Sequence, residues 1–238
     1  MKKIILIALG FTYGISYSQT FTPRIENINT NQFTYQELQK TGCPTPPVNI
    51  QIVPDISPVS WDYSLRSRDL KNMSTQPGQV VGLHKASTSI HFQSQIYYLT
   101  DNTGIQTCFT IWPSRVNIKL QSKIYISSEA SRLHCTKENT EAHEMQHQQV
   151  AIWALSEAQN NLYKELNSLF QKPVFFNTSL EAQNYYNNVI SRLQSNFISQ
   201  YHNIANPLNA KLDSHENYDL ENRKCPKDLP TLAYYLSL

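Results

Sequence analysis

Two histidines and the glutamate between them are the residues whose types and spacing indicate chemistry. The stretch EAHEMQHQQV, residues 141–150, contains His143, Glu144 and His147. Residues four apart lie on one face of a helix, so both imidazoles can bind one metal ion. Neutral imidazoles suit Zn²⁺, and Glu144 can take a proton from the metal-bound water. The spacing predicts a zinc-dependent hydrolase with Glu144 as general base and a protein or peptide substrate.

The alternative to a zinc motif is a chance spelling on a solvated helix. Polar residues surround the motif, namely Glu141, Gln146, Gln148 and Gln149. Both histidines, however, continue a stripe of small apolar residues, formed by Val150, Ala151, Ala154 and Ala158. Such a stripe is typical of the buried face of a helix. Two histidines on a buried face require partners, which favours a metal site.

A catalytic zinc ion requires a third protein ligand, and the sequence leaves its identity open. Glu157 and Glu165 lie on the same helix, about 15 and 27 Å beyond His147, which is too far. The final helical segment places polar residues on its apolar stripe, which comprises Leu208, Leu212, His215, Asp219 and Asn222. We expect Asp219 as the third ligand, ahead of the alternatives His215, Glu216 and His202. His215 and Tyr218 are also candidate donors to the oxyanion, and His215 bonded to Asp219 is the structural alternative.

Short runs of alternating hydrophobicity precede the motif, between Val80 and Ile126. In one of them the apolar residues Val116, Ile118 and Leu120 alternate with Asn117 and Lys119. This period of two predicts strands with one wet face, in a small antiparallel or mixed sheet. The sequence Asp-Asn-Thr-Gly at 101–104 is turn chemistry and indicates a hairpin.

Helical periodicity replaces the strand pattern after residue 127. We expect a first helix capped by Thr136 or Thr140 that ends at Lys172-Pro173. A second helix would run from about 179 to 204, with a break at Asn206-Pro207, and a third from 208 to about 223. The pattern predicts an α+β domain over residues 62–238, in which a sheet is followed by a long-helix hairpin that carries the motif.

The N-terminal sequence indicates export. Residues 1–18 run from a lysine pair through a short apolar stretch to Ser16-Tyr17-Ser18, which predicts a signal peptide cleaved before Gln19 and a secreted or periplasmic protein. A membrane anchor is the alternative, but the run is short and broken by glycines, and no later segment reaches about 18 apolar residues. Residues 19–61 are rich in Pro, Thr and Asn and predict an extended arm with at most edge strands.

Composition and cysteine count narrow the class further. A net charge of +2 without any run of Lys and Arg argues against a nucleic-acid partner. Four cysteines in an exported chain predict two disulfides, and the candidates are Cys43, Cys108, Cys135 and Cys225. Three pairings are open, of which we favour Cys108 with Cys135 and Cys43 with Cys225.

Two readings without catalysis compete with the peptidase. One is an exported binding or structural protein that retains the helix and the metal. The other is a carbohydrate or cell-surface binding module that uses the aromatic residues Tyr97, Tyr98, Trp112, Tyr185 and Tyr186. Aromatic residues at such spacings are more often packed within a sheet or against a helix, which disfavours the second reading.

The motifs together resemble the bacterial predicted secreted zinc-dependent proteases, a domain of unknown function. The likeness covers roughly residues 87–225 and rests on the export signal, Cys108, the runs 116–120 and 123–126, the motif at 143–147, and Tyr218-Asp219-Leu220-Glu221. It implies a zincin-like metallopeptidase in which His143 and His147 bind zinc and Glu144 is the base. The family's later Thr-x-His-Gly has no equivalent, since Asn222-Arg223-Lys224-Cys225 occupies that place.

Overall fold

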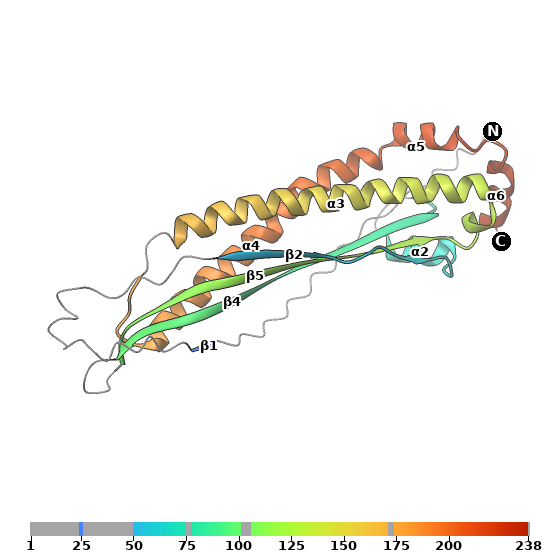
Figure 1. The fold of residues 1–238 in the computed structure, drawn as a ribbon. Helices are drawn as coiled ribbons and strands as arrows, with labels where there is room; N and C mark the ends of the chain where they lie inside the picture. Colours follow the sequence, from blue (N-terminus) through green and yellow to red (C-terminus); the bar gives the residue numbers. More distant parts are fainter. Residues whose placement is uncertain (1–23, 26–49, 75–77, 101–105, 171–173, 238) are drawn as a thin grey trace.

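The computed structural model describes residues 24–25, 50–74, 78–100, 106–170 and 174–237 (Figure 1). The predicted signal peptide, Cys43, most of the predicted arm and the turn at 101–104 lie outside the described residues. None of the described helices is long and apolar enough to cross a membrane.

One long hairpin forms the centre of the sheet. Strands β4 (Gly82–Thr100) and β5 (Gln106–Ile126) pair antiparallel along almost their whole length. Strands β2 (Gln51–Ile56) and β3 (Ser60–Asp62) add to β5 in parallel, and β1 (Arg24–Ile25) adds to β4 in parallel. The sheet is therefore mixed, and the described part of the predicted arm contributes only short strands beside the hairpin. The predicted short runs are parts of two strands that continue through register shifts at 93/94 and 97/99.

The predicted alternation on β5 is confirmed. Val116, Ile118 and Leu120 are fully buried, whereas Asn117 and Lys119 are only partly buried on the opposite face. A strand with this period can cover a helical layer with one face and meet solvent with the other.

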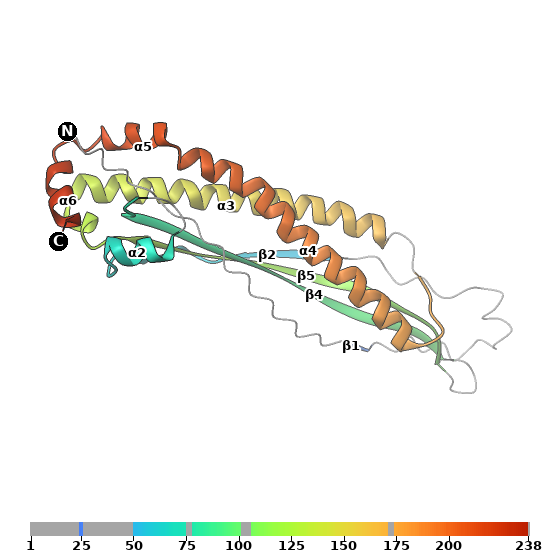
Figure 2. The same cartoon turned by 180° about the vertical axis from the view of Figure 1, so that it is seen from behind.

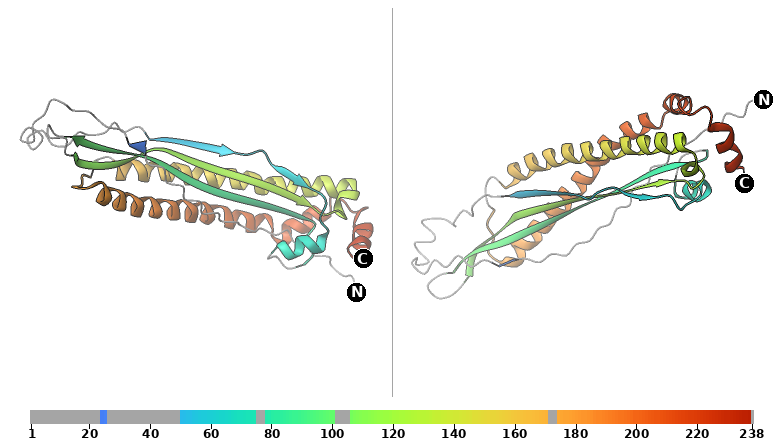
Figure 3. Two further views of the ribbon diagram at one scale, coloured as in Figure 1. Left: turned by 90° about the horizontal axis from the view of Figure 1, so that it is seen from below. Right: turned by 45° about the vertical axis from the view of Figure 1, so that its right-hand side comes forward.

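Two long helices form the second layer. Helix α3 (His134–Leu169) and helix α4 (Ser179–Leu212) run in opposite directions and cross each other (Figures 1 and 2). Figure 3 shows both helices on one side of the sheet, so the fold is an α+β arrangement of two layers. The core lies between these layers, and its largest fully buried residues on the helices are Leu155, Leu162, Tyr186, Phe197 and Tyr201.

The predicted break at Pro207 is wrong, because α4 continues through that residue to Leu212. A proline inside a helix costs about 3 kcal/mol. Ala205 and Asn209, on either side of it, are buried, so packing in this segment offsets the cost. The expected third helix from 208 is correspondingly shorter, since α5 spans His215–Asn222. Three further short helical elements were not predicted: α2 (Ser67–Met73), the 3₁₀ turn η1 (Ala130–Arg132) and α6 (Leu229–Leu236).

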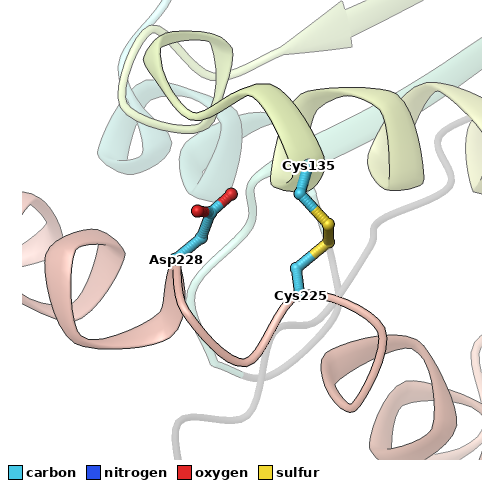
Figure 4. A group of neighbouring side chains, drawn as sticks. All are labelled: Cys135, Cys225 and Asp228. Atoms are coloured by element: carbon cyan, nitrogen blue, oxygen red, sulfur yellow. A yellow bond between two sulfur atoms is a disulfide. The ribbon is translucent and has the colours of Figure 1, made fainter.

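The start of α3 is held by the C-terminal segment. Cys135 and Cys225 form a disulfide, and the carboxylate of Asp228 points towards α3 (Figure 4). Asp228 Oδ2 accepts hydrogen bonds from the backbone N–H and the hydroxyl of Thr136, at 3.0 and 3.1 Å. The helix begins earlier than expected, with Leu133 at its N-cap, so neither Thr136 nor Thr140 is the cap. A carboxylate 92 residues further along the chain therefore accepts a hydrogen bond from a backbone N–H in the first turn of α3, which has no partner within the helix.

The favoured cysteine pairing is wrong for Cys135. This residue bonds to Cys225, and Cys108 is disulfide-bonded elsewhere. Cys108 lies near the beginning of β5, and the eighteen residues from there to the end of that strand span about 60 Å at 3.3 Å per residue. Cys135 lies beyond the far end of β5, so the length of the strand separates the two cysteines.

Candidate metal centre

Helices α3 and α4 bring three metal-ligating side chains together at one end of the molecule. His143 and His147 lie on the buried face of α3, with 2% and 1% of their surfaces exposed. Asp213 is the residue at the C-cap of α4, and 4% of its side chain is exposed. The returning α4 thus closes the site against the motif helix.

The ligand atoms converge at distances that suit zinc. Nε2 of His147 lies 3.1 Å from Nε2 of His143 and 3.1 Å from Oδ1 of Asp213, and Nε2 of His143 lies 3.5 Å from the same oxygen. A tetrahedral ion with bonds of about 2.0–2.2 Å separates its ligand atoms by roughly 3.3–3.6 Å. Two imidazoles and one carboxylate at these separations can occupy three positions of a tetrahedral ion and leave the fourth open.

The third member of the cluster is Asp213, and not Asp219 as the sequence predicted. Asp219, His215 and Glu216 are exposed residues of α5, and the described cluster of metal-ligating groups includes none of them. His202 lies two turns before Asn209, and its ring packs against Tyr201. The reason is the unbroken α4, whose straight return brings residues 209 and 213 opposite the motif.

A signal for Asp213 was present in the sequence. The buried residues of α4 recur at every fourth position along one stripe, which comprises Leu193, Phe197, Tyr201, Ala205 and Asn209. The next position on this stripe is Asp213. Extending the helix through Pro207 would have placed a carboxylate on the core face beside the two histidines.

Two neighbouring side chains orient the ligands. Asn209 Oδ1 lies 2.9 Å from Nδ1 of His147, so Nδ1 donates to the amide oxygen and Nε2 faces the cluster. The hydroxyl of Tyr218 donates to Oδ1 of Asp213 at 2.7 Å. Tyr218, a predicted alternative ligand or oxyanion donor, thus contacts the carboxylate of the cluster, and its role towards the oxyanion stays a prediction. These partners resemble the outer hydrogen bonds that fix ligand geometry in metal sites.

The electrostatics match a site that holds a cation. Burial opposes ionisation of Asp213, but its hydrogen bonds with both histidines and Tyr218 lower the pKa of the carboxyl to about 2. Burial also opposes protonation of His147, yet the neighbouring Asp213 and Glu144 raise its pKa. Burial lowers the pKa of His143. One carboxylate therefore stays charged between two imidazoles, and an ion bound here would displace the proton that the raised pKa of His147 favours.

Glu144 is completely buried beside the cluster, facing the first residues of β4. Burial raises the pKa of its carboxyl to about 8, although the charge of His147 and a backbone group of His84 oppose the shift. Nε2 of His84 contacts Gln148 at 2.9 Å, and its ring lies parallel to that of His147 at 6.4 Å. Burial beside the metal-ligating residues thus accounts for the raised pKa of the Glu144 carboxyl.

A small pocket borders the centre on the side of His143 and Tyr218. The rings of these two residues lie 5.7 Å apart, and the hydroxyl of Tyr218 reaches Asp213. The lining of this pocket thus includes one residue of the ligand cluster, His143.

Two other groups of residues do not form sites. Cys135, Cys225 and Asp228 lie close enough to share a metal, but the two sulfurs are bonded to each other and offer no thiolate. Most of the aromatic residues considered for a binding surface are buried, namely Tyr97, Tyr98, Trp112 and Tyr186. Of that group only Tyr185 is exposed, so these five residues do not form the aromatic surface that the carbohydrate-binding reading requires.

Comparisons with protein-family models, with curated proteins and with solved structures found no match to this chain. The resemblance to the secreted zinc-dependent proteases therefore stays a prediction, and the function must be inferred from the geometry of the centre.

Proposed function

We propose that this protein is an exported zinc-dependent metallopeptidase, in which His143, His147 and Asp213 hold the ion. The observation that carries the proposal is the convergence of three ligand atoms from two helices within 3.1–3.5 Å, with a buried glutamate beside them. The histidines are four residues apart, but the carboxylate lies 66 residues beyond His147. A chance spelling of the motif would not explain this arrangement.

The residues divide the chemistry between them. When bound, Zn²⁺ lowers the pKa of a coordinated water and polarises the carbonyl that the water attacks. Glu144 accepts the proton of the attacking water and returns it to the leaving amine, and burial makes its carboxylate more basic than that of an exposed glutamate. Asn209 and Tyr218 keep His147 and Asp213 in place throughout.

Export is part of the proposal. The charged and then apolar residues 1–18 fit a signal peptide. The disulfide between Cys135 and Cys225 fits an oxidising compartment. The compartment is tested by sequencing the N-terminus of the protein recovered outside the cytoplasm, which should begin at Gln19.

Metal content tests the centre. Wild-type protein should bind one zinc ion per chain, and Asp213→Asn should weaken binding by more than the roughly 10–100-fold that loss of an outer partner costs. Asp219→Asn is the matched control, because this carboxylate is exposed and lies outside the cluster. Wild-type protein without stoichiometric zinc, or equal effects of the two substitutions, would contradict the assignment.

Hydrolysis tests the base. Glu144→Gln should retain zinc and lose cleavage of a mixed peptide library by at least about 100-fold, because general base catalysis contributes roughly 10²–10⁴-fold. Glu138→Gln, an exposed position on the same helix, should cleave like the wild type.

The burial of the centre favours a second candidate, a non-catalytic binding or structural protein with a closed metal site. All three ligands have at most 4% of their side chains exposed, and structural zinc sites are closed. This reading predicts that chelation unfolds the protein and that Glu144→Gln changes no activity. The peptidase reading predicts that chelation abolishes cleavage and that zinc restores it.

A further inference from the structure

The residues that line the pocket beside His143 determine which chemical groups can enter it. It lies between the first turns of α3 and the two short C-terminal helices, and its surface is mostly apolar. Its lining residues are Val81, Thr136, Asn139, Thr140, His143, Tyr218, Glu221, Asn222, Cys225, Leu229 and Leu232. Val81, Tyr218 and Leu232 also belong to one buried hydrophobic cluster, so the wall they form is part of the folded core.

The size of the pocket limits what can enter. Its volume is about 40 Å³. On this measure one water molecule requires about 10–15 Å³, so the pocket has room for about three groups of that size. The branched end of a valine or leucine side chain has three carbons and matches this space, whereas an indole does not.

The pocket is held in shape by covalent and hydrogen bonds. The disulfide joins Cys225 in its wall to α3. Asp228, which directly precedes the lining residue Leu229, accepts hydrogen bonds from Thr136, a lining residue on α3. A pocket fixed in this way loses little freedom when a ligand enters, which increases affinity and selectivity.

The charges around the pocket disfavour an acidic guest. Glu221 is among the lining residues, and no lysine or arginine is. The ammonium group of Lys224 donates a hydrogen bond to the Glu221 carboxylate at 2.8 Å, but Lys224 is exposed and does not line the pocket. A carboxylate inside the pocket would face Glu221 and lose its hydration without gaining a cationic partner.

We propose that this pocket binds an aliphatic side chain of the substrate residue next to the scissile bond, and so determines cleavage specificity. The inference rests on the proposed function, since it takes the ligand cluster on the other side of His143 as the reaction centre. Leu229 and Glu221 are the residues that set size and charge preference.

Ligand binding tests the inference without turnover. The tested protein is the full-length Glu144→Gln variant loaded with zinc. The probes are dipeptide hydroxamates that differ only in the side chain next to the hydroxamate group. Calorimetry should show that an isobutyl side chain binds about 10–100-fold more tightly than a hydrogen atom. Carboxymethyl and indolylmethyl side chains should give no gain over hydrogen.

Pocket variants sharpen the result. Leu229→Ala should weaken the isobutyl compound several-fold and admit the indolylmethyl compound, because it enlarges the pocket. Glu221→Gln should improve the carboxymethyl compound about tenfold or more by removing a like charge. Leu220→Ala is the matched control, since Leu220 is 54% exposed and does not line the pocket. Zinc content and circular dichroism verify that each variant is folded.

The outcomes separate the two proposals. Equal zinc-dependent binding of the isobutyl and hydrogen compounds would overturn the pocket assignment and leave the metal centre intact. The assignment also fails if the preferences of Leu229→Ala match those of the wild type. Absence of zinc together with absence of binding by every hydroxamate would overturn the proposed function, and the pocket inference with it.

Discussion

Removal of the disulfide between Cys135 and Cys225 should destabilise the protein strongly. The bond joins residues 90 apart and closes a loop that contains nearly all of α3 and all of α4. Cross-linking a loop of that length removes chain entropy from the unfolded state, which amounts to about 4.5 kcal/mol in the loop-closure model. For a chain of this size, that loss corresponds to a fall in Tm of about 10–18 °C.

The variant for this test is Cys135→Ala with Cys225→Ala, studied under oxidising conditions so that the bond of Cys108 is unchanged. Urea unfolding followed by circular dichroism gives the free energy of unfolding, and metal analysis gives the zinc content. Lys227→Ala, an exposed position in the same segment, is the control and should stay within about 0.5 kcal/mol of the wild type.

Zinc should remain bound in the folded double variant, because His143, His147 and Asp213 are positioned by the packing of α3 on α4. A loss below about 1 kcal/mol would refute the loop-closure reasoning. Loss of zinc from a variant that is still folded would show that the C-terminal segment, and not the helix pair, holds the centre together.

Three further predictions concern single positions. Tyr218→Phe removes the hydrogen bond to the metal-site carboxylate and should lower zinc affinity about 10–100-fold in a chelator competition; unchanged affinity would contradict that role. Leu162→Ala should cost about 2–5 kcal/mol in urea unfolding, whereas Leu180→Ala, 65% exposed, should cost less than about 0.5; similar values would refute the core assignment. The hydrogen bond from Lys123 helps to lower the pKa of Asp62 to about 2, below its value in the unfolded chain. The ionised Asp62 therefore stabilises the fold above about pH 4, and this stabilisation is lost as the pH falls towards 2. Asp62→Asn should abolish that part of the acid dependence of Tm, and an unaltered profile would exclude it.

The strands and the long helices could be predicted because their periodicity is a local property. Val116, Ile118 and Leu120 report the buried face of β5 directly, and the motif helix follows from its stripe of small residues. The two histidines were found for the same reason, since spacing within one helix needs no knowledge of its neighbours.

The third ligand and the cysteine pairing depend on long-range geometry, which local patterns do not report. The sequence rule that proline ends a helix shifted the expected partner from Asp213 to Asp219, because it ignored the packing that carries α4 through Pro207. The hydrogen bonds from the first turn of α3 to Asp228 were missed similarly, since Asp228 is far away in the chain. Cys108 was paired wrongly because the length of β5 was underestimated: the pattern predicts several short runs, whereas the structure has two long strands.

The Cys135–Cys225 disulfide and the proposed metal centre are nested along the chain, and this has a consequence for assembly. The segment between His147 and Asp213 lies wholly within the loop that the Cys135–Cys225 bond closes. If the disulfide forms first, the metal ligands are already closer together in the unfolded chain. Metal binding then costs less chain entropy than it does in the reduced chain. Oxidation should therefore precede zinc uptake on the efficient route, and the oxidised, metal-free chain should acquire zinc faster than the reduced one.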